Sequence, residues 1–326
     1  MGTGCHPKSE SVSMTKIYSS ASADRFKRLK LLFALSRTPH GLLDMATPAF
    51  SVLLYLGGFP PIGVVLLGLI TAFAGYTAIY ALNDLIDYRS DKKKNNKVSN
   101  APDNYLDSMV VRHPMAQGVL TLKAGILWTA GWSLVALCGA YLLNPMCVLI
   151  FVAGAALETV YCLLWRISPW RSVISGFVKN SGPVAALFAV DPSPSPLFTL
   201  FLFSGLFFWE IGGQNIPADW TDVDLDRRFN AKTIPVHLGK EKSASLMLVS
   251  LSIACILMTF LMALQFSAPR WLSILMAAAA GAALLLAPAV KLYYGQKRQN
   301  AILLFNLASY YPLSLLAIAL ILWLIS

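Results

Sequence analysis

The sequence predicts an all-α, polytopic membrane protein with about nine transmembrane helices, and three observations support this. Of the 326 residues, 56% are hydrophobic and 13% are charged, with a mean hydropathy of +0.61. This composition is too apolar for a soluble globular domain. Apolar runs of roughly 20 residues, enough to cross a bilayer as a helix, recur from about residue 41 onward. Basic residues concentrate in alternate loops, as in membrane proteins of defined orientation.

The chain begins with a predicted N-terminal arm, residues 1–38, followed by a transmembrane domain, residues 39–326. Residues 1–23 are polar and rich in Ser, which predicts partial disorder. Residues 24–35 alternate basic and apolar side chains and predict an amphipathic helix lying at the membrane surface.

Each later apolar run predicts one span, because its length and low charge suit the bilayer core. The predicted spans, in order, are 41–58, 62–82, 123–143, 145–165, 172–190, 197–216, 244–266, 271–292 and 301–325. Loops on one side are short and carry little charge, whereas loops on the other side are long and polar. The two longest, about 83–122 and 217–243, follow the second and the sixth span, which suggests an internal duplication of a four-helix unit.

The distribution of basic residues orients the chain. If the N-terminus is cytoplasmic, every Lys and Arg except Lys179 and Arg270 lies on the cytoplasmic side. The net charge of +10 therefore reflects topology and attraction to anionic lipid, and nucleic acid is not an expected partner. We expect an integral protein of the plasma (inner) membrane with a cytoplasmic N-terminus.

Two clusters of aspartates, both on the predicted cytoplasmic side, share one spacing. In each cluster the carboxylates fall at i, i+3 and i+7, within about 60° of one helix face. Like charges this close destabilise an isolated helix, so the arrangement calls for a counter-ion. The clusters are Asp84, Asp87 and Asp91, and Asp219, Asp222 and Asp226.

The two clusters allow three interpretations. Solvated helix ends would explain one cluster but not a repeated spacing. A transporter would carry its ionisable residues near the bilayer midplane, whereas these lie at helix ends. The third interpretation is a Mg²⁺–diphosphate site, in which facing carboxylates hold cations that stabilise a diphosphate leaving group. It is the favoured one.

Neighbouring polar residues fit a diphosphate site. Asn83 and Asn215 lie one turn before an aspartate of their cluster and can add neutral oxygen ligands. Asp224 points away from its cluster and is left out. The cations expected to grip diphosphate oxygens are Arg112, Lys232 and Arg227.

Polar and ionisable residues inside the predicted spans must face a cavity or one another. They are either satisfied buried pairs or a polar spot beneath the diphosphate that binds or deprotonates an acceptor. The residues concerned are Glu158, Lys179, Asn180 and Glu210, with Tyr161 and Gln214 one turn from the two glutamates. Aromatic rings that could shield a carbocation are those of Tyr76, Tyr80, Phe207, Phe208 and Trp209.

Three stretches carry a resemblance to a known family: NDLIDYRSD (83–91), HPMAQG (113–118) and DWTDVDLDRRFNAKTIPVHLG (219–239). Over about residues 35–325, the chain resembles the UbiA superfamily of intramembrane prenyltransferases. The resemblance implies a nine-helix bundle around a central cavity with a lateral opening to lipid. It also implies Mg²⁺-dependent ionisation of a polyprenyl diphosphate, whose allylic cation alkylates an acceptor that is typically aromatic.

The chain departs from the family pattern in three places. His113 stands where Arg is usual, about ten extra residues (97–106) precede it, and Trp165 replaces a Lys after Tyr161. These changes bear on the acceptor, and a 4-hydroxybenzoate-like acceptor is not assumed.

The expected function is Mg²⁺-dependent transfer of a prenyl group from an isoprenoid diphosphate to an aromatic or lipophilic acceptor. Tyr161 is expected to contribute to substrate binding. The alternatives are a terpene cyclase that ionises the same donor without an acceptor and, from a different class, a membrane transporter.

Overall fold

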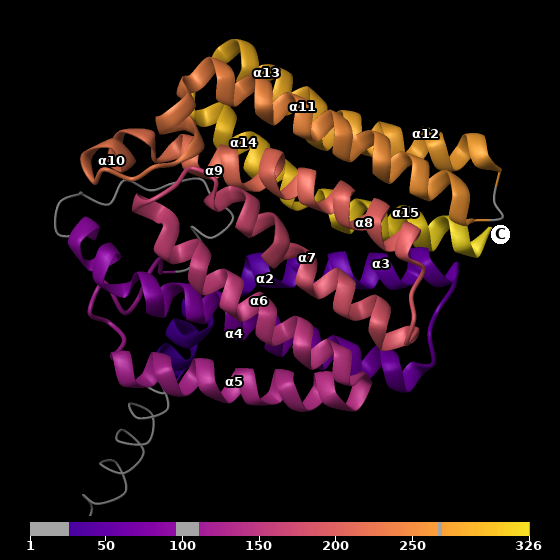
Figure 1. Cartoon of the computed structure of the whole chain (residues 1–326), viewed down its shortest axis with the longest axis horizontal. Coiled ribbons are helices and arrows are strands. Elements are labelled where there is room, and N and C mark those ends of the chain that lie inside the picture. Colours follow the sequence, from indigo (N-terminus) through magenta and orange to yellow (C-terminus); the bar gives the residue numbers. More distant parts are fainter. Residues whose placement is uncertain (1–25, 96–110, 267–268, 326) are drawn as a thin grey trace, which may run out of the picture.

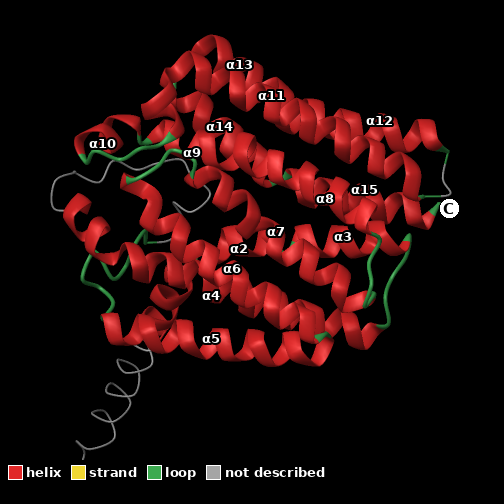
Figure 2. Ribbon diagram, in the orientation of Figure 1, coloured by secondary structure: helices red, strands yellow, loops and turns green. Residues whose placement is uncertain are grey.

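The computed structural model describes residues 26–95, 111–266 and 269–325, and these form helices joined by turns, with no strand among them (Figures 1 and 2). Residues 1–25 of the predicted arm and the extra segment 97–106 lie outside this range. Within the predicted surface helix, residues 26–35 are helical, with the first five side chains exposed and Leu35 buried.

The structure confirms the predicted all-α membrane fold. Within the described ranges, eight helical stretches are long and apolar enough to cross a membrane. The helices are α2 (Thr38–Asp44), α3 (Ala46–Leu56), α4 (Ile62–Asn95), α5 (Leu122–Leu143), α6 (Pro145–Leu163), η2 (Leu164–Arg166), α7 (Arg171–Val190), α8 (Pro196–Trp209), η3 (Glu210–Asn215), α9 (Ile216–Thr221), α10 (Val223–Arg228), α11 (Ile234–Gln265), α12 (Arg270–Gly281), η4 (Ala282–Leu286), α13 (Ala287–Gly295), α14 (Arg298–Ser309) and α15 (Tyr311–Leu324).

The first predicted span is a broken helix, which is why eight long helices are found instead of nine. α2 ends at Asp44 and α3 begins at Ala46. Pro48 lacks the N–H that would bond the Asp44 carbonyl. The Thr47 hydroxyl donates to that carbonyl instead (2.8 Å). Each half is therefore shorter than a spanning helix.

Proline also shapes two of the longer spans. η3 is a π-helical segment between α8 and α9, and η4 is a second one between α12 and α13. Pro217 and Pro288 follow them, and each removes one backbone donor from its helix. A π-turn shifts the register of the side chains that follow it, which matters because η3 leads directly into the second acidic cluster.

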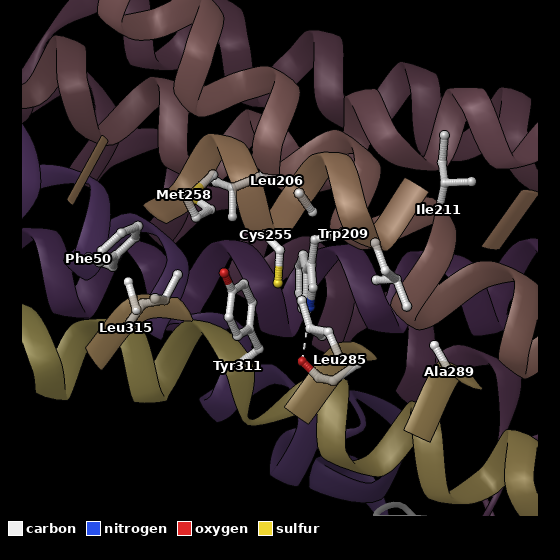
Figure 3. Close-up of a cluster of buried hydrophobic side chains, with 14 of the residues drawn as sticks. Phe50, Leu206, Trp209, Ile211, Cys255, Met258, Leu285, Ala289, Tyr311 and Leu315 are labelled. Atoms are coloured by element: carbon white, nitrogen blue, oxygen red, sulfur yellow. Dashed lines mark hydrogen bonds between the residues drawn. The ribbon is translucent and has the colours of Figure 1, made fainter. Parts of the chain in front are cut away.

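The bundle packs α4 along α5, α6 along α7, and α8 along α11. α9 and α10 lie at the end of the bundle opposite the C-terminus (Figure 1). The main core includes Trp209, Met258, Tyr311 and Leu315, and the Trp209 Nε1 donates to the Ala308 carbonyl at 2.9 Å (Figure 3). This core joins the C-terminal helices to α3 and α8 and leaves the space between α4, α6, α7 and η3 for a cavity.

Candidate active site

A cavity of about 630 Å³ runs inside the bundle, with a polar end and an apolar end. Both Asp91 and Val64 of α4 line it, so it follows that helix for about 40 Å at 1.5 Å per residue. The apolar end is formed by side chains such as Leu69, Leu143 and Phe151. The polar end contains five of the six predicted aspartates: Asp87, Asp91, Asp219, Asp222 and Asp226.

The first acidic cluster lies on one continuous helix, α4, as predicted. Asp84 is not among the cavity-lining residues. It is 3% exposed, and its carboxylate lies 2.9 Å from His113 Nδ1 and 3.6 Å from the Arg37 guanidinium. His113 also lies 3.1 Å from Asp91. The ligand atoms of Asp84, Asp91 and His113 lie within 4.8 Å of one another, a geometry that could hold a metal ion.

The second acidic cluster is not on one continuous helix, so that prediction is wrong. α9 ends at Thr221 and α10 begins at Val223, and Asp222 lies between them with φ −109° and ψ 10°. Asp219 is buried, with Oδ1 3.3 Å from Arg171 and Oδ2 without a hydrogen-bond partner among the described residues. Asp226 accepts a hydrogen bond from Thr233 (3.1 Å).

The two predicted asparagines have matching partners. Asn83 donates to Glu158 Oε1 (2.6 Å), and Asn215 donates to Glu210 Oε1 (2.6 Å). Their amide oxygens accept hydrogen bonds. The oxygen of Asn83 accepts one from Arg37 (3.3 Å), and the oxygen of Asn215 accepts one from the Tyr161 hydroxyl (3.5 Å). Each glutamate thus fixes the orientation of an amide at the polar end of the cavity.

Arg37 and Arg171 are candidate functional residues. The distribution of basic residues predicts for them only a position on the cytoplasmic side of the membrane. Both line the cavity, and each forms an ion pair with the first aspartate of one cluster. Arg171 also donates to the Tyr161 hydroxyl (2.8 Å). Their positions carried a signal, because each arginine precedes its cluster by nearly the same number of residues.

The other predicted cations differ in position. Arg112 lines the cavity. Lys232 and Arg227 are exposed and are not among the lining residues, although the Lys232 backbone N–H donates to the Trp165 carbonyl at 2.9 Å. Their proposed contact with diphosphate stays a prediction.

Deeper in the cavity, a second polar region lies beneath the aspartates. Glu158, Glu210, Gln214 and Lys179 line it. Lys179 pairs with the Asp44 carboxylate and donates to the Tyr80 hydroxyl (2.8 Å). Of these intramembrane charges, Lys179 is paired with Asp44, and the two glutamates face the cavity. The sequence allowed both arrangements.

The remaining predicted residues divide into two groups. Tyr76 and Tyr80 line the cavity, whereas Phe207, Phe208 and Trp209 do not. Trp209 instead belongs to the core. Asn180 donates to the Gly176 carbonyl (2.8 Å) and lies outside the lining.

The chemistry of the polar end suits Mg²⁺ and a phosphorylated ligand. Carboxylates from α4, α9 and α10 converge on one space, and hard divalent cations prefer such oxygen donors. The unpartnered Oδ2 of Asp219 offers a ligand atom that no donor among the described residues uses. Beside the carboxylates, the buried Arg171 and the partly exposed Arg37 provide bidentate donors for phosphate oxygens.

Comparisons with known proteins agree with this description. A sequence profile described as the UbiA prenyltransferase family matches residues 45–310. No curated protein sequence matches the chain. A solved UbiA homolog from Aeropyrum pernix K1 has a TM-score of 0.70 at 18% identity, covering 86% of this chain and 97% of its own.

Two further structures are similar. One, described as a digeranylgeranylglyceryl phosphate synthase, has a TM-score of 0.66 at 18% identity, covering 92% of this chain and 100% of its own. The other is a UbiA homolog from Archaeoglobus fulgidus bound to DMAPP and Mg²⁺, with a TM-score of 0.63 at 14% identity, covering 88% of this chain and 99% of its own. The profile match spans most of the sequence, and the chain belongs to the UbiA prenyltransferase family.

Proposed function

We propose that this protein is an integral membrane prenyltransferase that transfers a prenyl group from an isoprenoid diphosphate to an aromatic or lipophilic acceptor, with Mg²⁺ as cofactor. The observation that carries the proposal is a single cavity that joins two acidic clusters to a long apolar end. A prenyl diphosphate has the same division, with a charged head and an apolar tail.

Similar structures support the choice of donor and cofactor. UbiA homologs from Archaeoglobus fulgidus were solved with DMAPP and Mg²⁺ and with GPP and Mg²⁺. We propose that Asp87, Asp91, Asp219, Asp222 and Asp226 hold Mg²⁺ in this chain, and that Asp84 completes the first cluster through Asp91 and His113.

In the proposed mechanism, Mg²⁺ supplies Lewis-acid stabilisation of the departing diphosphate. Arg37 and Arg171 orient the carboxylates and offer donors to diphosphate oxygens, as does Arg112. The apolar walls exclude water, which would otherwise quench the allylic cation. Tyr161 lines the cavity and is held by Arg171, which also contacts Asp219.

We also propose the orientation of the protein. The excess of Lys and Arg in the loops beside the acidic clusters favours a cytoplasmic location for both clusters and for the N-terminus, in the plasma (inner) membrane. The charged head of the donor would then enter from the cytoplasm while its tail stays in the bilayer.

The proposal is tested by product analysis. Protein reconstituted in lipid nanodiscs with Mg²⁺ and radiolabelled geranyl diphosphate should release diphosphate and transfer label to a lipophilic product when membrane lipid extract supplies the acceptor. The Asp222→Ala variant should release none. Cyclic hydrocarbon products formed without any acceptor would assign a terpene cyclase instead, and vesicle flux without diphosphate release would favour a transporter.

A further inference from the structure

Glu210 and Gln214 line the cavity beneath the second acidic cluster and carry polar atoms that no described residue uses. They are 3% and 4% exposed. Neither Glu210 Oε2 nor one amide atom of Gln214, assigned as Nε2, has a hydrogen-bond partner in the described chain. A buried polar atom without a partner is costly and calls for an explanation, and a bound ligand would provide one.

The orientation of the Gln214 amide follows from its neighbour Ser309. The Ser309 hydroxyl lies 2.8 Å from the Phe305 carbonyl and 3.3 Å from Gln214 Oε1. It has one proton, and the shorter contact takes it. The Gln214 amide is then rotated by 180° relative to its assigned orientation, so that Nε2–H donates to the Ser309 oxygen. This rotation leaves Oε1 as the atom without a partner. When Glu210 is ionised, both unused atoms are acceptors, and a fitting ligand donates hydrogen bonds.

The charges around these atoms disfavour an anionic ligand. Lys179 and Arg37 both lie over the Tyr80 ring, and they already pair with Asp44 and Asp84. Glu158 and Glu210 both line the same region. A carboxylate placed here would meet two glutamates and no uncommitted lysine, which is unfavourable in a low-dielectric environment.

Aromatic side chains surround the same region. Tyr76, Tyr80 and Phe305 line the cavity. Phe305 lies one turn before Ser309 on α14 and stacks on His40, with ring centroids 5.5 Å apart. An aromatic or other apolar group can therefore pack beside the two unused acceptors.

We propose that Glu210 and Gln214 form the acceptor subsite, and that they bind an uncharged compound through a hydroxyl group that donates to Glu210 Oε2. This inference rests on the proposed function, because it assigns the second substrate of that reaction. The subsite adjoins the donor site directly, since Glu210 Oε1 accepts from Asn215, one turn before Asp219. A hydroxyl held by Glu210 thus lies beside the polar end of the cavity.

The test compares three probes that share one ring system: 1-naphthol, 1-methoxynaphthalene and 1-naphthoate. Equilibrium binding is measured with the full chain in nanodiscs, with Mg²⁺ present. Because only 1-naphthol is uncharged and able to donate, it should bind about tenfold more tightly than either of the others, the effect of one well-placed hydrogen bond.

A matched pair of variants assigns the preference to Glu210. Glu210→Gln keeps Oε1 for Asn215 and Ser175 and replaces Oε2 with an amide donor, so the preference for hydroxyl over ether should disappear. Glu241→Gln makes the same change in an exposed glutamate that does not line the cavity and should keep the preference. Partition of the probes into lipid is the same for all three proteins and cancels in the comparison.

The inference is overturned if wild-type protein binds the ether or the naphthoate as tightly as naphthol, or if Glu210→Gln keeps the preference. If Glu210→Gln does not fold, the wild-type ratios decide alone after the partition of each probe into protein-free nanodiscs has been subtracted. Diphosphate release by the same preparation separates the two proposals. Release without a preference for naphthol removes the subsite only, and a preference without release removes the proposed transferase function only.

Discussion

At the scale of single residues, the first aspartate of each cluster is buried and forms an ion pair with one arginine. Arg37 pairs with Asp84 and Arg171 with Asp219. A buried charged carboxylate is costly unless it is paired or binds a cation, so each arginine offsets part of the cost of placing a carboxylate of its cluster there. Arg171 also fixes Tyr161, and its loss would disturb both the carboxylate and the ring.

We therefore expect Arg171→Leu to lower the rate of diphosphate release by on the order of 100-fold, the effect of removing one preorganised donor. Arg166→Leu provides the control. Arg166 lies at the same end of the bundle but is exposed, and it is not among the cavity-lining residues. Initial rates at saturating Mg²⁺ measure the difference, and equal rates for the two variants would argue against the role of Arg171.

Residue types and their spacing predicted most of the polar end of the cavity, and its geometry shows why some residues were missed. Five of the six predicted aspartates line one cavity. Spacing alone could not separate Asp84 from Asp87, because the difference comes from His113 and Arg37, which approach Asp84 from other segments. Lys232 lies close to the second cluster in the sequence, yet its side chain is exposed.

At the scale of elements, η3 connects the core to the active site. Its side chains Glu210, Gln214 and Asn215 line the cavity. Its glycines Gly212 and Gly213 face the neighbouring helices: a Cβ on Gly212 would lie 3.0 Å from the Met247 carbonyl oxygen, and one on Gly213 would lie 2.9 Å from Ala308 Cβ. These close approaches fix which side of η3 faces the ligand.

We expect Gly212→Ala to lower the thermal unfolding midpoint, because the added methyl group would overpack against α11 at a cost of about 1–3 kcal/mol. Gly131→Ala is the matched control. Its Cβ would meet nothing within 4 Å, and alanine is the better helix former, so its midpoint should stay or rise. Unfolding of purified protein in detergent, followed by intrinsic fluorescence, measures both. A Gly212→Ala protein as stable as the control would contradict the tight packing of η3.

Hydropathy predicted the spans well but not their internal breaks. Apolar composition does not distinguish a straight helix from one interrupted at Met45 or widened at η3. In both places the deciding residue is a proline that removes a backbone donor, Pro48 and Pro217. The break at Asp222 had no such signal, and it is why the second cluster does not occupy one helix face.

At the scale of the whole molecule, the two acidic clusters lie at the same cavity although they are far apart in the sequence. α4 brings the first cluster and α9 with α10 the second, and residues of both line the same cavity. Each cluster has an arginine partner and an asparagine held by a glutamate. This correspondence is consistent with the predicted duplication and supports the proposal that the two clusters form one site.

The most direct test is the Mg²⁺ dependence of binding of a non-reacting donor, geranyl thiolodiphosphate, to wild-type protein and to Asp87→Asn, Asp222→Asn and the double variant. Removal of Mg²⁺ with EDTA should weaken wild-type binding on the order of 100-fold. Each single variant should lose most of the strengthening of binding by Mg²⁺. The double variant should bind only slightly more weakly than either single variant, because both clusters are needed to hold the metal. Binding that is independent of Mg²⁺, or single losses that add as independent contributions, would contradict a shared metal–diphosphate site.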